Sequence, residues 1–352
     1  MEKREQGYLY AISAAVLFGA STPAAKILLG KIDPWLLAGV LYLGSALGLF
    51  IIFSLQIVLH KTALNEASLK YKDWKWLLCT VFIGGILGPV FLMVGLSKVS
   101  ASSASLFLNL EAVFTALLAW FVFNEHVDYK IALGMLSIVI GSLILSWKGN
   151  LNDQNIQGSM LIAGACLCWA IDNNLTRKIS AANPVQIAMI KSFVAGLINT
   201  SFAIIYGSLL PDYLILFTAS TIGFISYGLS LILFIFGLRY IGAARTGAYF
   251  SLAPFVGAGF AITFLEDPVS FQFILAALFM GIGIWLHLTE YHSHEHQHEE
   301  LEHEHTHAHD EHHQHNHLFL DEKSNPNTHL HKHKPISHKH PHYPDIHHRH
   351  KH

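Results

Sequence analysis

The chain has 352 residues, of which 52% are apolar and 13% charged, and its formal net charge is -2. Before residue 292, most charges lie in short clusters between long uncharged runs, whereas a soluble domain of this length would spread charge over amphipathic faces. Three cysteines are too few for a disulfide scaffold. This pattern excludes an ordinary soluble protein and predicts an all-α integral membrane protein.

Apolar stretches long enough to cross the hydrocarbon core, which takes about 20 helical residues, recur along the chain. Short connections separate them, except for a longer polar loop around residues 60–73. In chain order, the ten predicted transmembrane helices are 7–29, 35–59, 74–97, 100–124, 129–147, 158–178, 184–206, 212–237, 241–265 and 271–290.

Lys and Arg predict the orientation of these spans, because positive charge marks the cytoplasmic side. With the N-terminus inside, the inner segments collect Lys3, Arg4, Lys61, Lys70, Lys72, Lys75, Lys130, Arg177, Lys178, Arg239 and Arg245. The outer segments collect only Lys26, Lys31, Lys98 and Lys148. An even number of spans then returns the chain to the cytoplasm, so we predict a multi-pass protein of the cell membrane with both termini cytoplasmic.

The second half of the chain repeats the first. At a shift of 142 residues, the stretch from Gly95 to about Gly141 falls on Gly237 to Gly283 without a gap, and Glu125 meets Asp267 at the same helix end. In the first spans, the matches are Phe18, Gly19 and Lys26 with Trp169, Ala170 and Arg177 at a shift of 151, and Asp33-Pro34 with Asn183-Pro184 at a shift of 150.

Five spans per half is an odd number, so the second half must be inverted relative to the first. Inverted repeats around a central site are a transporter architecture. We therefore predict two inverted five-helix repeats, residues 1–149 and 150–291, followed by a histidine-rich tail, residues 292–352.

Five spans repeated twice, with Phe18-Gly19 or Trp169-Ala170 in the first span and an acid closing the fourth, resemble the EamA-like branch of the drug/metabolite transporter superfamily. The resemblance covers about residues 7–290. The family pattern favours Trp-Gly and Gly-Glu at these places, whereas this chain has Asn124-Glu125 and Glu266-Asp267 after the fourth spans. Family members carry small organic solutes, often outward, so the resemblance implies a permease of that class and leaves the solute open.

Glu111 lies near the middle of its span, where ionisable side chains are costly and are candidates for function. Its repeat counterpart is Ala253, so packing symmetry does not require the charge. With Asn109 it could line a central cavity and take up a proton during transport. The alternative is a structural Glu that bonds to a neighbouring helix.

Three consecutive polar residues interrupt the sixth span, and together they point around most of the helix, so at least one faces a cavity or another helix. Lys191 lies about two turns into the next, antiparallel span, at a depth similar to that of Asp172. We predict a buried Asp172–Lys191 pair, which is either a structural clamp or a gate that opens on substrate binding. The candidate substrate-cavity residues are Asn109, Glu111, Asp172, Asn173, Asn174 and Lys191.

All but three of the 25 histidines lie after residue 291. The tail cannot bury a core, so we predict that it is disordered without metal. Imidazole groups with carboxylates nearby suit Zn, Ni, Co or Cu, and the tail is therefore predicted to bind a divalent transition metal. The candidate ligands are His292, His294, His296, His298, His303, His305, His307, His309, His312, His313, His315 and His317.

These observations favour a secondary permease of small organic metabolites with a metal-binding regulatory tail. One alternative is an exporter of Ni, Co or Zn that is fed by the tail, although the spans hold no convincing His or Cys ligand set. Another is a membrane-anchored metal sensor or store, for which ten spans are more than an anchor needs.

The sequence contains neither a catalytic constellation nor a nucleotide-binding loop, so we predict that the protein is not an enzyme and that an ion or solute gradient drives it. No cofactor is required. The expected partners are the lipid bilayer and a small-molecule or metal-ion substrate, with no nucleic acid, and a homodimer is compatible with the sequence.

Overall fold

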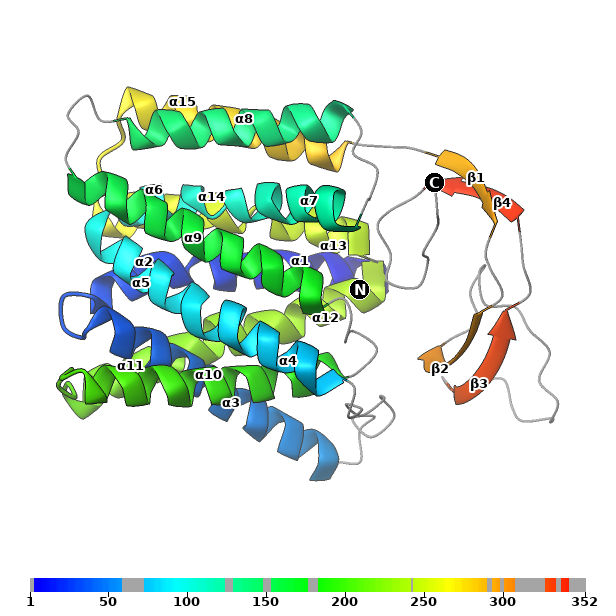
Figure 1. Cartoon of the computed structure of the whole chain (residues 1–352), viewed down its shortest axis with the longest axis horizontal. Coiled ribbons are helices and arrows are strands. Elements are labelled where there is room, and N and C mark those ends of the chain that lie inside the picture. The colour runs from blue at the N-terminus through cyan, green and yellow to red at the C-terminus, as the bar shows by residue number, and fades with distance from the viewer. Residues whose placement is uncertain are drawn as a thin grey trace.

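The computed structural model describes the membrane body and four short strands of the tail (Figure 1). Apart from the strands, the described residues form helices that run roughly side by side in one bundle, as predicted for an all-α membrane protein. The described residues are 3–58, 73–123, 129–147, 153–176, 183–241, 243–289, 293–297, 301–307, 327–333 and 337–341.

The first half of the bundle contains two interrupted spans and one span with a π-helical turn, η2. Its elements are α1 (Lys3–Gly19), α2 (Ser21–Leu28), α3 (Pro34–Val58), α4 (Trp74–Thr80), η2 (Val81–Leu87), α5 (Gly88–Lys98), α6 (Ala101–Phe107), α7 (Leu110–Phe123) and α8 (Tyr129–Ser146).

The second half begins with an uninterrupted helix and also contains a π-helical turn, η4. Its elements are α9 (Asp153–Thr176), α10 (Pro184–Ile205), α11 (Tyr213–Gly223), η4 (Phe224–Leu229), α12 (Ser230–Ile241), α13 (Ala243–Phe250), α14 (Ala253–Leu265) and α15 (Phe271–Leu288).

Within the described residues, nine helical segments are long and apolar enough to cross a membrane, and they coincide with nine of the ten predicted spans. The predicted sixth span is α9, which has 24 residues and contains the polar run at 172–174, so it is less apolar than the others. α9 nevertheless packs along α5 and α7 inside the bundle. The start of α1 and the end of α15 lie at the same end of the bundle, which requires an even number of crossings (Figure 1).

Contacts between the halves follow a twofold pattern. The second spans α3 and α10 pack together, as do the fifth spans α8 and α15. The first span contacts the eighth through α1 and α12, and the sixth contacts the third through α9 and α5. Exchanging the two halves maps this set of contacts onto itself, as expected for a pair of inverted repeats.

Local backbone features repeat at the shifts found in the sequence. At a shift of 142, residues 82–87 of η2 fall on η4, and the break between α6 and α7 falls within one residue of the break between α13 and α14. Asp33 Oδ1 accepts from the backbone N–H of Trp35 at 2.9 Å, and Asn183 Oδ1 accepts from Val185 at 2.9 Å. Both side chains satisfy free N–H groups at the start of a second span.

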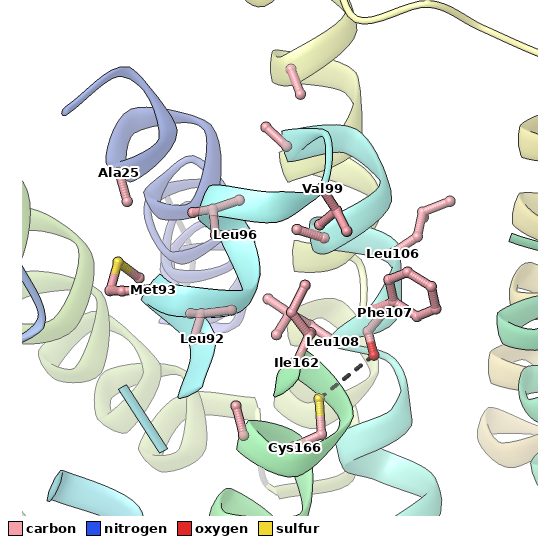
Figure 2. Packing of buried hydrophobic residues seen from close by; sticks show 14 of the residues in the cluster. Ala25, Leu92, Met93, Leu96, Val99, Leu106, Phe107, Leu108, Ile162 and Cys166 are labelled. Carbon is pink, nitrogen blue, oxygen red and sulfur yellow. Dashed lines mark hydrogen bonds between the residues drawn. The ribbon is translucent and has the colours of Figure 1, made fainter. Parts of the chain in front are cut away.

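The packing separates an apolar exterior from a close-packed interior. Large apolar side chains such as Phe121, Leu143 and Phe217 are more than half exposed and cover the outside of the bundle, where lipid would contact them. Inside, α5, α6 and α9 meet where Leu96, Phe107 and Ile162 are buried (Figure 2).

The tail contains four strands, β1 (Ser293–Gln297), β2 (Leu301–His307), β3 (Asn327–His333) and β4 (Ser337–Pro341). β1 pairs with β4 and β2 with β3, both antiparallel. These short ribbons differ from the expectation of a tail without regular structure. The alternation of histidine with other residues has the period of two that an extended strand requires.

Candidate functional site

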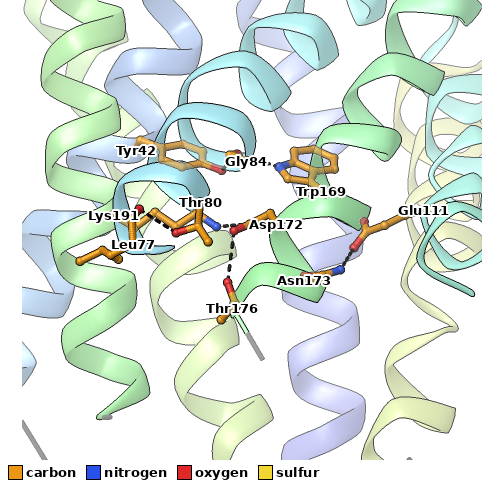
Figure 3. Close-up of polar contacts among 10 residues, drawn as sticks. All are labelled: Tyr42, Leu77, Thr80, Gly84, Glu111, Trp169, Asp172, Asn173, Thr176 and Lys191. Atoms are coloured by element: carbon orange, nitrogen blue, oxygen red, sulfur yellow. Dashed lines mark hydrogen bonds and ion pairs between the residues drawn. The ribbon is translucent and has the colours of Figure 1, made fainter. Parts of the chain in front are cut away.

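Asp172 on α9 and Lys191 on α10 form the ion pair that the sequence predicts, so that prediction is confirmed (Figure 3). The Asp172 side chain is 7% exposed and the Lys191 side chain 18%. The second carboxylate oxygen of Asp172 accepts a hydrogen bond from Thr176 Oγ1 at 3.2 Å. Because both oxygens have partners, these interactions offset the free-energy cost of burying the carboxylate. The ion pair also fastens α9 to α10.

Gly84 of η2 makes room for the ion pair, because a Cβ atom there would overlap the Asp172 carboxyl group. A Cβ at Gly85 would instead meet Ala195 Cβ at 2.8 Å and would be in ordinary contact with Lys191 at 3.6 Å. The backbone of η2 therefore forms one wall of the charged region, and larger residues at Gly84 would displace Asp172.

Side chains from the second half donate to the carbonyl groups of η2. Trp169 Nε1 donates to Gly84 O at 3.0 Å, and Asn199 Nδ2 donates to Gly85 O at 3.4 Å (Figure 3 shows the first of these). A π-helical turn departs from regular i→i−4 bonding, and carbonyl groups without partners are costly away from water. These donors therefore stabilise η2 in the position that contacts Asp172.

Glu111 faces α9. It lies in the first turn of α7, just after the break in the fourth span, and its Oε1 accepts from Asn173 Nδ2 at 2.7 Å (Figure 3). Asn173 is exposed and Glu111 is partly exposed, in contrast to the buried Asp172. Glu111 is also close enough to interact electrostatically with Asp172 and Lys191, so α7, α9 and α10 bring four of the candidate residues into one region.

The other two candidates take different positions. Asn109 is buried and donates to Leu106 O at 2.9 Å, which bridges the break between α6 and α7. Asn174 is buried and donates to Ala170 O at 2.9 Å, one turn back on its own helix. Asn109 therefore does not share a hydrogen-bonded partner with Glu111, because the break turns the two side chains toward different helices.

Aromatic side chains lie beside the charged region. Tyr42 is within electrostatic range of Asp172 and Glu111, and its hydroxyl is 3.5 Å from Gly84 O. Its ring centroid is 5.7 Å from that of Tyr227 on η4, which is 6.0 Å from Phe18 on α1. The charged groups and these rings thus connect both halves at the middle of the bundle.

A second polar network fixes the end of the bundle where α2, α5 and α6 meet. Lys26 Nζ donates to Leu96 O at 2.6 Å and to Val99 O at 2.7 Å, at the end of α5. Asp267 Oδ2 accepts from the backbone N–H of Ser102 at 2.8 Å, at the start of α6. The sequence comparison singled out Lys26 and Asp267 as repeat-matched positions but did not predict these bonds. The repeat counterparts of Lys26 and Asp267, which are Arg177 and Glu125, lie outside the described residues.

No group of three or more His, Cys, Asp or Glu side chains that could hold a metal ion occurs among the residues whose side chains the structure describes. The candidate tail ligands, from His292 to His317, lie outside that set, as do His60 and His126. His287 Nε2 lies 3.1 Å from Ile131 O and joins α15 to α8.

Sequence reasoning missed the groups that hold η2. Trp169 was identified only as a repeat match of Phe18, and Asn199 was not singled out at all. A polar Asn within an apolar span was the available signal, since such a side chain needs a partner in a bilayer.

Comparisons with known proteins agree with this architecture. The sequence model of the EamA-like transporter family matches residues 5–147 and again residues 156–289. A solved crystal structure superimposes with a TM-score of 0.59 at 14% identity, covering 81% of this chain and 96% of its own, and that likeness shows the fold alone.

Two relatives are similar over most of the chain. A protein named an uncharacterized transporter from Methanothermobacter thermautotrophicus is 29% identical over 299 residues, which cover 81% of this chain and 86% of the relative. A probable amino-acid metabolite efflux pump of Escherichia coli (strain K12) is 24% identical over 307 residues, which cover 81% of this chain and 95% of the relative.

Proposed function

The chain belongs to the EamA-like transporter family, and from this premise we propose that it is a secondary permease for small organic solutes carrying both an ammonium and a carboxylate group. The family places it among multi-pass membrane transporters rather than enzymes. The solute class is our proposal, as are a cell-membrane location, cytoplasmic termini and a gradient as the source of energy.

The observation that carries this proposal is the Asp172–Lys191 pair beside Glu111. A zwitterion can replace each member of such a pair, since Lys191 can bind its carboxylate while Asp172 binds its ammonium group. Glu111 and Asn173 are more exposed than the pair and provide polar groups next to it. The Escherichia coli relative, named a probable amino-acid metabolite efflux pump, supports the same solute class.

The sequence is compatible with two roles for the ion pair, a structural clamp or a gate. In this proposal the pair is the gate. Breaking it without replacement leaves two charges with little exposure to water, which costs about 3–5 kcal/mol. The pair therefore stays closed in the empty protein and opens when a solute supplies both charges.

The tail supplies the second part of the proposal, a metal-dependent control of the body. Histidines that alternate with carboxylates are suited to Zn, Ni, Co or Cu. The same pattern supports the alternative function, export of a transition metal that the tail delivers. The family match ends at residue 289, so the tail is an addition to the part of the chain that resembles other transporters.

A flux experiment tests both functions. The intact protein and a version that ends at Tyr291 would be reconstituted in liposomes, and the movement of a labelled amino-acid mixture and of labelled Ni, Co and Zn would be measured. We expect amino-acid flux from both forms, reduced at least tenfold by Glu111→Gln and altered by metal only in the intact protein. Metal flux without amino-acid flux would establish the alternative, and no flux of either kind would contradict both.

A further inference from the structure

The two π-helical turns occupy equivalent places in the two halves but differ in their surroundings. η2 contacts α9 and α10, and η4 contacts α1 and α3. The shifts of 151 and 150 that align the first and second spans make Phe18 the counterpart of Trp169 and Leu49 the counterpart of Asn199. Each pair of counterparts can therefore be compared directly.

At η2, both positions hold hydrogen-bond donors. Trp169 Nε1 binds Gly84 O, and Asn199 Nδ2 binds Gly85 O and also Ile86 O at 3.3 Å. The Asn199 amide is itself held in place, because its Oδ1 accepts from Trp35 Nε1 at 3.3 Å.

At η4, the same two positions are filled by side chains that cannot donate. The Phe18 ring packs edge-on against Tyr227, and Leu49 lies 3.6 Å from where a Cβ at Gly228 would be. Among the residues that the structure describes, no side chain donates a hydrogen bond to a carbonyl group of residues 224–229. Side-chain donors therefore bind the carbonyl groups of η2 but not those of η4, where Tyr227 instead uses its own side chain to bond with Ser21 on α2.

We propose that the two turns have divided roles: Trp169 and Asn199 are positioning residues that make η2 a fixed platform for the Asp172–Lys191 pair, and η4 is the hinge of the bundle. A π-helical turn is a weak point in a helix and is often found at functional sites. Hinges are short segments that absorb backbone changes while their neighbours stay rigid. Tyr227 couples η4 to the platform through its contact with Tyr42.

The chain supplies its own matched substitutions. Asn199→Leu gives η2 the residue that η4 has, and Leu49→Asn gives η4 the donor that η2 has, and the two side chains have the same branched shape and the same number of non-hydrogen atoms. Trp169→Phe does the same at the other position. Leu49→Met keeps the volume without adding a donor and is the control.

Hydrogen–deuterium exchange of the purified full chain, followed by mass spectrometry of peptides that cover η2 and η4, tests the proposal. One hydrogen bond changes an opening equilibrium by about fivefold. We expect η4 to exchange at least fivefold faster than η2 in the native protein, Asn199→Leu or Trp169→Phe to accelerate η2 by about fivefold, and Leu49→Asn to slow η4 while Leu49→Met does not.

Equal exchange at the two turns, or no response of η2 to the loss of either donor, would overturn the proposal. This measurement does not depend on the solute, so it remains decisive if the proposed function fails. Where flux is observed, Leu49→Asn is expected to slow it by about fivefold without changing the solute preference, and slower exchange at η4 with unchanged flux would also overturn the role of η4 as the hinge.

Discussion

The two halves of the bundle share a backbone arrangement but not a charge distribution. Asp172 and Lys191 correspond by the repeat shifts to Ser21 and Leu41, and Glu111 corresponds to Ala253. Each charged member of the candidate site therefore has an uncharged counterpart in an equivalent place. The repeat-related half thus packs without these charges, and their concentration in one region is what the proposed transport function uses.

The largest expected effect comes from making one member of the ion pair resemble its counterpart. Lys191→Leu leaves Asp172 without its partner at a site that is 7% exposed, so we expect a loss of about 3–5 kcal/mol in the free energy of unfolding. Thermal denaturation in detergent measures it. The double variant Asp172→Ser with Lys191→Leu should regain most of the loss but should not transport. A single variant as stable as the native protein would show that Asp172 finds another partner.

The next effect concerns transport rather than stability. Glu111→Ala introduces the residue found at the repeat-related position and removes the bond to Asn173. Hydrogen bonds to charged groups contribute about 1.5–3 kcal/mol, so we expect solute flux to fall by about tenfold to a hundredfold. The melting temperature should change less, because Asn173 is exposed and water can replace its bond to Glu111. Unchanged flux would return Glu111 to the structural role considered from the sequence.

A smaller effect is expected where η2 approaches the pair. Gly84→Ala places a methyl group against the Asp172 carboxyl, and overpacking of this kind costs about 1–3 kcal/mol. Gly259→Ala on α14 is the control, because a Cβ there meets no atom within 4 Å, and it should be neutral or slightly stabilising. If both variants melt alike, the close approach of η2 to Asp172 does not constrain the site.

The smallest effect is expected at the other polar network. Asp267→Ala removes the acceptor for the Ser102 N–H at the start of α6, and the loss of such a cap costs about 1 kcal/mol. Asp212→Ala provides the comparison, because Asp212 precedes α11 without a side-chain capping bond. We expect lower melting temperatures only for the first variant. A similar fall in melting temperature in both variants would mean that the negative charge of the side chain, and not its bond to the Ser102 N–H, stabilises this end of the bundle.

Parts of the candidate site were predictable because they depend on composition and helix spacing. Asp172 and Lys191 were paired from their depths in antiparallel spans, and the structure confirms the bond. The partner of Glu111 could not be predicted, because the break before α7 sets the direction of that side chain. The same break turned Asn109 toward Leu106 rather than into a shared cavity with Glu111.

The sequence by itself determined the membrane class and the positions of nine spans, because the length of each apolar stretch can be read along the chain. The internal similarity between the two halves is likewise a property of the sequence. Only the tertiary structure decided where the π-helical turns fall and which side chains hold them. Those features depend on contacts between residues more than a hundred positions apart, such as Asn199 with Gly85, and the spacing of residues within one helix carries no information about such contacts.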